Sequence, residues 1–177
     1  GAYFQAILVA TEDTAFAIVS KRAEATLTWA ANRYYGKLVP NLPAFGLISE
    51  DWEAAVELAR NDFDGNLNTA KIQAFCKSAA AVDFCTDTDA LYTEQRFLPS
   101  AGQLFLIYIN RTAINTLISA ANANGYEFES IDTNYYWSSS QYDEFCAWYV
   151  NMRGGNTYGS DKDNRSYVRA VSAFLKF

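Results

Sequence analysis

The chain has 177 residues, half of them apolar and 16% aromatic, which is enough for one domain with a substantial hydrophobic core. Its formal net charge of −6 argues against a nucleic-acid partner, whose binding would need clustered Lys and Arg. Histidine is absent, which excludes a His-based catalytic triad and a His-ligated zinc. No apolar run approaches the roughly 20 residues of a membrane-spanning helix, so we expect no membrane insertion.

The first third of the chain is predicted to be rich in strands. Tyr3 to Val9 and Ala15 to Val19 are apolar runs, and the turn-like residues Thr11 to Thr14 lie between them. This pattern indicates a β-hairpin. Pro40 and Pro43 then mark a loop.

Three helices are predicted in the middle of the chain. Ser49 precedes two acids, as an N-cap does, which predicts a helix from about Glu50 to Arg60. Apolar residues recur at helical spacing between Asn66 and Ala81. The segment Ser100 to Gln103 has the pattern of a capping box, and we expect the helix that it begins to continue toward a C-cap near Gly125.

The last third of the chain has the composition of strands and turns. Tyr135 to Trp137 and Phe145 to Met152 are predicted strands, and Gly154-Gly155 is a two-residue hairpin signal. Asn156 to Ser166 is a predicted polar loop, and Ser166 to Phe174 alternates as a closing strand. The order of strands, helices and then antiparallel strands predicts an α+β fold.

The chain offers few groups for catalysis. Cys76, Cys85 and Cys146 lack the spacing of a zinc or redox site, so we expect free or buried thiols, with a Cys76–Cys85 disulfide left open. Cys146 has no histidine to activate it and no second thiol nearby. Ser138 to Ser140 lack the pattern of a nucleophile elbow, and we expect these hydroxyls to bond strand backbone groups. We therefore expect no enzyme and no cofactor.

Two acidic segments raise the question of calcium. Asp161 to Asn164 supplies carboxylate and amide oxygens, which calcium prefers, but the spacing does not complete an EF-hand. Asp62 to Asn66 is a second such segment and is more typical of a turn. The Pro-containing motifs of calcium-dependent lectins are also missing, so we expect no bound metal.

Several segments resemble a bacterial family with a C-type-lectin-like fold, related to formylglycine-generating-enzyme-type domains. The family is abundant in gut Bacteroidetes and includes variable proteins of diversity-generating retroelements. The segments that carry the resemblance are Tyr136 to Tyr142, Ala147-Trp148, Val168 to Val171 with Phe174, Asp64 to Ile72, and Phe97 to Leu104. They cover about the last two thirds of the chain, whereas residues 1–60 match loosely.

The resemblance implies that residues 1–177 form a single C-type-lectin-like domain, with helices packed on small antiparallel sheets. Members of the family display variable side chains from their last strands and loops. Transferred to this sequence, the ligand-binding residues are Tyr142, Asp143, Glu144, Phe145, Tyr149, Asn151, Arg153, Asn156, Tyr158, Ser160, Asp161, Asp163, Asn164, Arg165 and Tyr167. In family members that a retroelement diversifies, this region is often very rich in asparagine, and it is less so in this chain. The composition fits either a chain whose asparagines have already been replaced by diversification or a relative that is not diversified.

The aromatic residues of this region divide between core and surface. Trp137 and Trp148 are predicted to be core residues of a sheet. Polar neighbours favour exposure of four tyrosines, whose ring and hydroxyl make them efficient contact residues. These are Tyr142, Tyr149, Tyr158 and Tyr167.

The arginines divide in the same way. Arg169 lies in a strand, where we expect an ion pair or hydrogen bonds to carbonyls. Arg153 and Arg165 are either solvated surface charges or contacts to a polar or acidic ligand.

The favoured function is that of a non-catalytic domain that displays a ligand-binding face for a protein or a glycan. The alternatives are an adhesin or pilus-associated assembly subunit, in which Ala2 to Val9 pairs with a partner strand, and an enzyme that uses Cys146. Gly1 lies directly before an apolar run, as it would after removal of a signal or lipoprotein segment. We therefore expect a location at the cell surface or outside the cell.

Overall fold

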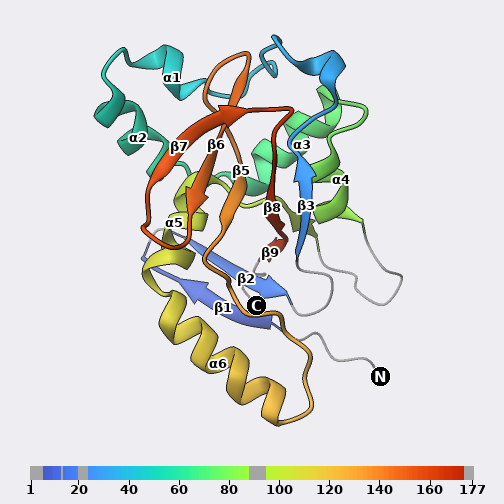
Figure 1. Cartoon of the computed structure of the whole chain (residues 1–177), viewed down its shortest axis with the longest axis vertical. Coiled ribbons are helices and arrows are strands. Elements are labelled where there is room, and N and C mark those ends of the chain that lie inside the picture. Colours follow the sequence, from blue (N-terminus) through green and yellow to red (C-terminus); the bar gives the residue numbers. More distant parts are fainter. Residues whose placement is uncertain (1–5, 13, 20–23, 88–94, 174–177) are drawn as a thin grey trace.

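Residues 6–12, 14–19, 24–87 and 95–173 are described by a computed structural model, in which helices surround two β-sheets (Figure 1). This arrangement confirms the predicted α+β class. The helices are α1 (Phe45–Ile48), α2 (Trp52–Arg60), α3 (Gly65–Phe75), α4 (Ala80–Thr86), α5 (Ala101–Ile109) and α6 (Arg111–Ala123), with a 3₁₀ turn at Asn32–Tyr34.

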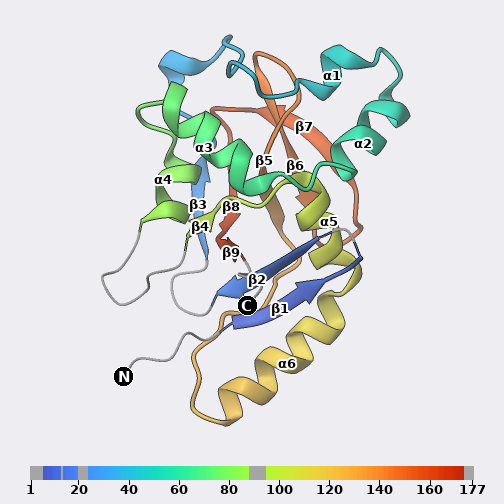
Figure 2. The same ribbon diagram turned by 180° about the vertical axis from the view of Figure 1, so that it is seen from behind.

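The smaller sheet joins the beginning of the chain to its end. Its strand order is β1-β2-β9-β4, and all of its pairs are antiparallel. The strands are β1 (Ala6–Ala10), β2 (Ala15–Val19), β4 (Arg96–Phe97) and β9 (Val171–Ala173). The β1–β2 pair confirms the predicted hairpin within the described residues. Because β9 pairs with β2, the C-terminal segment closes onto the N-terminal hairpin (Figure 2).

The larger sheet carries the C-terminal region and has the order β3-β8-β5-β6-β7. Its strands are β3 (Glu24–Thr28), β5 (Tyr135–Gln141), β6 (Cys146–Asn151), β7 (Thr157–Asp161) and β8 (Arg165–Arg169). β5 and β8 run parallel and meet where Tyr136 lies opposite Tyr167, whereas the other pairs are antiparallel. β7 is therefore an edge strand of this sheet.

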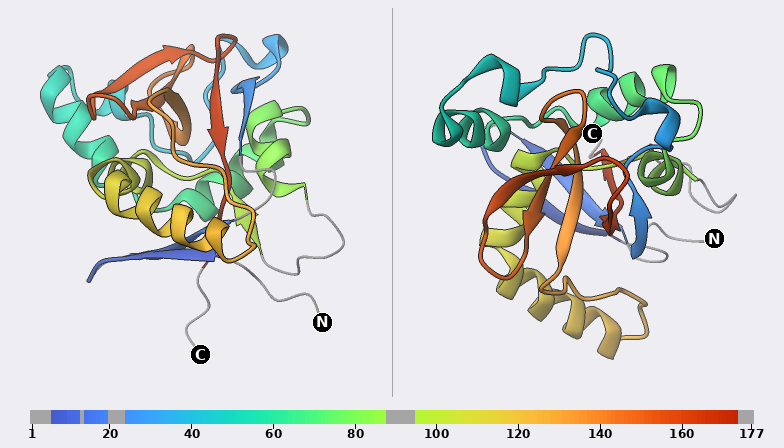
Figure 3. Two further views of the ribbon diagram at one scale, coloured as in Figure 1. Left: turned by 60° about the horizontal axis from the view of Figure 1, so that its bottom comes forward. Right: turned by 45° about the horizontal axis from the view of Figure 1, so that its top comes forward.

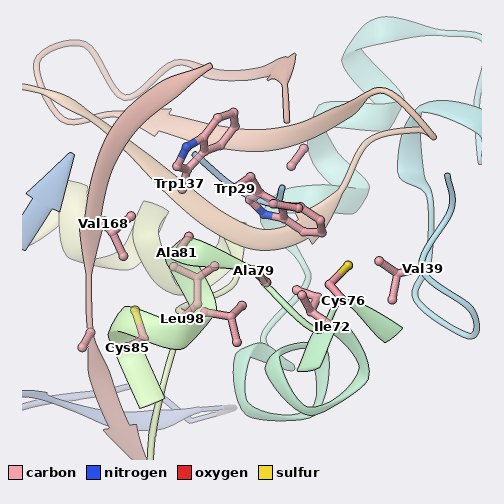
Figure 4. Packing of buried hydrophobic residues seen from close by; sticks show 14 of the residues in the cluster. Trp29, Val39, Ile72, Cys76, Ala79, Ala81, Cys85, Leu98, Trp137 and Val168 are labelled. Atoms are coloured by element: carbon pink, nitrogen blue, oxygen red, sulfur yellow. The ribbon is translucent and has the colours of Figure 1, made fainter. Parts of the chain in front are cut away.

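One core cluster lies between the larger sheet and α3 and α4 (Figure 4). Trp29 and Trp137 are fully buried in it against Ile72 of α3 and Cys85 of α4. Burying each large apolar side chain stabilises the fold by roughly 1.5–3 kcal/mol. The predicted core positions of Trp137 and Trp148 are confirmed, because both side chains are fully buried.

A second core cluster lies between the smaller sheet and α5 and α6. Phe16 and Ile18 of β2 pack there with Leu104 of α5 and Ile114 of α6. Figure 3 shows α6 alongside β1. Among the described residues, no single helix is long and apolar enough to cross a membrane, and α5 and α6 reach that length only together, across a bend of 75°.

Two of the predicted helices are each broken in the structure. The helix expected between Asn66 and Ala81 ends at Phe75, because Cys76 takes an extended conformation, and α4 starts afterwards. The helix expected to run on from Ser100 bends at Asn110, where α5 ends and α6 begins. Apolar spacing could not reveal these breaks, because the residues on both sides of each break still face a core.

Two of the three predicted helix ends are confirmed. The Ser100 N–H donates to Oε1 of Gln103 over 3.0 Å in the expected capping box. Gly125 has a φ of 86° directly after α6, as a C-terminal glycine does. The prediction of Ser49 as the cap of α2 is wrong, because the carboxylate of Asp51 accepts from the backbone N–H of Ala54 over 2.8 Å.

Three predictions for the C-terminal region are corrected. Asn156 to Ser166 is not a loop, because it contains β7 and the start of β8. The β6–β7 turn has four residues, Met152 to Gly155, instead of two, since the Asn151 N–H donates to the Asn156 carbonyl. The closing strand splits at Ala170 into β8 and β9, which belong to different sheets, and Phe174 lies outside the described residues. β7 escaped detection because an edge strand can be polar.

The start of α5 lies against the chain directly after α2, and the absence of a side chain at Gly102 permits this approach. A Cβ at Gly102 would lie 2.4 Å from the Asp62 carbonyl and 2.6 Å from the Arg60 carbonyl. We predict that Gly102→Ala lowers the free energy of unfolding by about 2 kcal/mol, measured by urea denaturation. Gly154→Ala is the control, since its Cβ would meet the Asn156 amide at 3.3 Å. Equal losses in the two variants would contradict this packing.

Candidate functional site

Four aromatic side chains form a continuous row from β5 across β6 and β7 to α2. We call this row, made of Tyr135, Tyr149, Tyr158 and Trp52, the aromatic strip. Its successive ring centroids are 5.0, 6.1 and 6.2 Å apart. Tyr135, Tyr158 and Trp52 are 46%, 39% and 42% exposed, and Tyr149 is half-buried. The strip is therefore a surface feature that rests on the larger sheet.

The strand register brings the three tyrosines of the strip together. Tyr149 of β6 lies opposite Trp137 of β5 on one side and opposite Tyr158 of β7 on the other, and Tyr135 shares a face with Trp137 because it lies two residues before it on β5. Residues directly opposite each other in an antiparallel pair share a face of the sheet, so their rings meet. Trp52 joins the row because α2 faces the core with the small residues Ala55 and Ala59, which leaves the indole near the surface.

Trp52 also connects the strip to the core. Its ring lies 5.4 Å from Trp148 and 5.9 Å from Tyr142. Tyr142 packs edge-on against Trp148 at 4.9 Å and lies over two glycines, where added Cβ atoms would come within 2.4 Å (Gly46) and 3.1 Å (Gly159) of its ring. Tyr142 is therefore a half-buried packing residue beneath the strip.

Lys162 has a buried side chain although it lies in the acidic turn between β7 and β8. It is 1% exposed, and its Nζ donates to the carbonyls of Lys37, Asp143 and Glu144 over 3.1, 2.9 and 3.0 Å. A further bond of 3.1 Å goes to Oε1 of Gln141. One side chain thus joins the β7–β8 turn to the β5–β6 loop and to the loop before α1.

The buried amide of Gln141 extends this network. Its Oε1 also accepts from the Val39 N–H over 2.9 Å, and its Nε2 donates to the Leu42 carbonyl over 3.4 Å. The backbone of Lys162 contributes as well, since its N–H donates to the Phe145 carbonyl and its carbonyl accepts from the Trp29 N–H. We call Lys162 and Gln141 the polar node.

Burial lowers the pKa of Lys162 to about 8, although the nearby carboxylate of Asp143 acts to raise it. Its four oxygen partners suit an ammonium, which has three N–H donors and no lone pair to repel them. Because the amine is out of contact with solvent, its task is structural.

The described thiols are poorly suited to nucleophilic chemistry. Cys76, Cys85 and Cys146 are all free, so the disulfide that the sequence left open is not formed. Burial raises the pKa of Cys146 to about 12, with the carboxylates of Asp143 and Asp161 adding to the effect. Burial likewise raises the pKa of Cys76 to about 11. A thiolate, the reactive form, is disfavoured at these positions.

Of the fifteen residues expected to bind a ligand, fourteen lie at the two ends of the β6–β7 hairpin and along its middle, and Tyr167 lies on β8. At one end, the β5–β6 loop lies beside the β7–β8 turn, and this group contains Tyr142, Asp143, Glu144, Phe145, Ser160, Asp161, Asp163, Asn164 and Arg165. The β6–β7 turn at the other end carries Asn151, Arg153 and Asn156, and Tyr149 and Tyr158 lie between the two groups. The structure therefore does not gather all fifteen into one cluster.

The expected exposure of four tyrosines is correct for Tyr158 and wrong for the others, which are half-buried. Tyr142 packs beneath the strip, and Tyr149 lies between two strand neighbours. Tyr167 lies away from the strip, because its ring packs 5.7 Å from Tyr136 against the second core cluster. Polar neighbours in the sequence do not indicate exposure here, because successive residues of a strand project from opposite faces of the sheet.

Some of the side chains expected to bind a ligand instead form hydrogen bonds within the turns in which they lie. Oδ1 of Asp143 accepts from the backbone N–H groups of Phe145 and Cys146 over 2.7 and 2.6 Å. Oδ1 of Asn151 accepts from the Arg153 N–H over 2.8 Å, and Nδ2 of Asn164 donates to Oγ of Ser160 over 3.2 Å. These side chains shape the loops in which they lie.

The arginines follow the division that the sequence indicated. Arg169 is buried and donates to the Glu129 carbonyl over 2.8 Å, which confirms its expected structural role. Arg165 is exposed and donates to the Thr26 carbonyl over 2.5 Å, and Arg153 is exposed in the β6–β7 turn. Arg153 thus projects where a ligand could reach it.

Two of the three predicted serines bond backbone groups as expected, whereas the buried Oγ of Ser139 has no hydrogen-bond partner among the described residues. Ser138 Oγ donates to the Trp148 carbonyl over 2.7 Å, and Ser140 Oγ accepts from the Ala101 N–H over 2.9 Å. Ser140 also donates to the Asp62 carboxylate over 2.6 Å, which engages one oxygen of the second candidate calcium segment. Within the part of the chain that the structure describes, no group of three or more Cys, Asp and Glu residues could hold a metal ion.

Trp52 and Tyr135 are two residues of the strip that the sequence-based prediction of the site does not include. A signal for Trp52 was present, because a helix whose core face consists of alanines leaves a neighbouring tryptophan at the surface. No protein-family model matches this chain, and no curated protein matches it either. The assignment to a C-type-lectin-like family therefore remains a prediction.

Loss of the Lys162 amine would leave several carbonyls without a donor, so we predict that Lys162→Met lowers the free energy of unfolding by about 3 kcal/mol at pH 7. The folded chain releases the proton near pH 8, whereas the unfolded chain holds it up to the usual pKa of 10.5. Wild-type stability therefore gains relative to the variant as the pH rises through this window, by up to about 3 kcal/mol.

Urea denaturation at pH 7 and pH 9.5 measures both effects. Lys77→Met, at an exposed lysine, is the control and should change stability by less than about 0.5 kcal/mol at either pH. A gap between wild type and Lys162→Met that narrows with rising pH would contradict the buried amine.

Proposed function

We propose that this chain is a non-catalytic ligand-binding domain that presents the aromatic strip and the neighbouring turns to a protein or glycan ligand. The observation that carries the proposal is the strip itself, a row of four contacting rings of which three are about 40% exposed or more. Aromatic rings exposed together on a rigid sheet bind partners at a low cost in conformational entropy.

The chemistry of the region favours binding over catalysis. The chain contains no histidine, and the pKa of Cys146 is raised to about 12 by burial and by two neighbouring carboxylates. The amine of Lys162 is enclosed by its four oxygen partners and cannot reach a substrate. The proposal therefore assigns no catalytic residue and no cofactor to the domain.

The proposal includes the C-type-lectin-like fold and a relationship to retroelement-diversified proteins. Three features support it: the helices pack on small sheets, the C-terminal β9 pairs with the N-terminal hairpin, and the C-terminal strands carry exposed turns. Exposed residues such as Arg153, Asn156 and Asp163 would be suited to variation. The proposed location is the cell surface or the extracellular space.

A second candidate function is that of an adhesin or pilus-associated subunit, and the position of β1 favours it. β1 is the edge strand of the smaller sheet, and its Leu8 is 48% exposed. An exposed edge can accept a strand from another chain. If β1 serves assembly, Leu8→Lys should abolish any dimer or higher oligomer seen by light scattering, and a monomeric wild type would contradict this function.

For the proposed ligand-binding function, we predict that Tyr135→Ser combined with Tyr158→Ser weakens binding at least tenfold. The probe is a printed panel of bacterial and host glycans and of surface-protein fragments, exposed to the labelled chain. Both rings lie at the surface, so the melting temperature should fall by less than about 4 °C.

Tyr126→Ser is the matched control, because Tyr126 is 46% exposed, as Tyr135 is, and lies beyond α6. It should bind the same probes within twofold of wild type. Binding that survives the loss of Tyr135 and Tyr158, or a panel on which the wild type binds nothing, would contradict the proposed function.

A further inference from the structure

A groove runs beside the aromatic strip, between α2 and the β6–β7 turn. Its volume is about 600 Å³. Its polar and aromatic lining consists of Trp52, Glu53, Glu57, Arg60, Asn61 and Asn156. Trp52 thus belongs both to the groove and to the strip, which makes the two surfaces continuous.

The spacing of α2 builds one wall of the groove from two adjacent rows. Trp52 and Arg60 lie two turns apart on one row, and Glu53, Glu57 and Asn61 follow one another on the next. Residues four apart project from the same side of a helix, so the groove receives an aromatic ring, two carboxylates, an amide and a guanidinium.

Arg60 fixes this wall to the larger sheet. Its Nε donates to Oγ1 of Thr157 over 3.1 Å, and its Nη2 donates to the Gly155 carbonyl over 2.7 Å. The guanidinium also lies 4.1 Å from the centre of the Phe105 ring. The groove is therefore held in shape before any ligand arrives, which lowers the cost of binding.

The mixture of groups limits the class of ligand. A strongly anionic ligand would meet the carboxylates of Glu53 and Glu57, and a strongly cationic ligand would meet the guanidinium of Arg60. A neutral ligand rich in hydroxyls can use all of them, because each hydroxyl both donates and accepts. Carboxylates accept, guanidinium donates, and the amides of Asn61 and Asn156 do both.

Besides hydrogen-bonding groups, a site for a sugar ring needs a flat apolar surface, and the exposed indole of Trp52 supplies it. A pyranose has an apolar face of C–H groups as well as its hydroxyls, and this face packs on a flat aromatic ring. Trp52 is 42% exposed and stacks on Tyr158 with an angle of 25° between the ring planes. A platform of parallel rings beside planar polar groups thus matches both surfaces of a sugar.

We propose that the α2 groove binds a sugar residue of a neutral glycan, with Trp52 as the stacking platform and Glu57, Asn61 and Asn156 as hydrogen-bonding partners. This inference rests on the proposed ligand-binding function and names its ligand class. The glycan continues along the aromatic strip, whose ring spacings of 6.2, 6.1 and 5.0 Å are comparable to the length of one sugar residue.

A printed array of neutral, acidic and basic oligosaccharides tests this assignment, followed by titration of the best binder. The wild type is expected to bind a neutral oligosaccharide, and affinity should change less than threefold between 50 and 500 mM salt, since no net charge is paired. Three of the four tryptophans are fully buried, so a shift in tryptophan fluorescence on binding reports Trp52.

Two groove variants and one control complete the test. Glu57→Ala and Trp52→Leu should each weaken binding at least tenfold, whereas Glu50→Ala, an exposed acid outside the groove, should stay within twofold. Glu57 is exposed, so its replacement should leave the fold intact and keeps the test decisive if Trp52→Leu unfolds.

The outcomes separate this inference from the proposed function. If a probe binds and Glu57→Ala has no effect while Tyr135→Ser abolishes binding, the groove assignment is overturned and the ligand-binding function stands. Binding of charged probes alone, lost at high salt, also overturns the assignment. If neither set of variants changes binding, both proposals fail.

Discussion

The buried ammonium of Lys162 is the interaction on which the C-terminal region depends. Its bonds to three backbone carbonyls and to Gln141 tie together the loop before α1, the β5–β6 loop and the β7–β8 turn. These segments also share apolar contacts, since Val39 and Leu42 belong to the first core cluster and Tyr35 packs 5.2 Å from Phe145. A single charge, desolvated and surrounded by oxygen atoms, thus adds to the apolar packing there.

The aromatic strip and the α2 groove lie along the β6–β7 hairpin, and the polar node holds one end of this hairpin. The rings of Tyr135 and Tyr158 and the side chain of Arg153 remain at the surface, outside the contacts of the polar node. The packing of Trp52 on Trp148 and Tyr142 then joins the strip to α2. The structure thus separates buried residues that maintain the scaffold from exposed residues, as the proposed ligand-binding function requires.

Local patterns in the sequence were enough to predict the β1–β2 hairpin, the capping box at Ser100 and the burial of Trp137 and Trp148. Features that depend on distant partners were not predictable in this way. Lys162 lies among acids in the sequence, and its burial depends on carbonyls contributed by Lys37 and the β5–β6 loop. β7 is polar, which its position at the edge of the sheet permits, and the register that aligns Tyr149 with Tyr158 is a property of the assembled sheet.

A library of all single substitutions of the chain, displayed on a cell surface and selected for resistance to a protease, tests most directly whether the scaffold residues and the proposed display face are separate. The account predicts that Lys162, Gln141 and Trp148 tolerate almost no replacement, whereas Tyr135, Arg153 and Tyr158 tolerate nearly all of them with resistance unchanged. If the exposed positions proved as intolerant as the polar node, the aromatic strip would be part of the folding core, and the account of a display face would be contradicted.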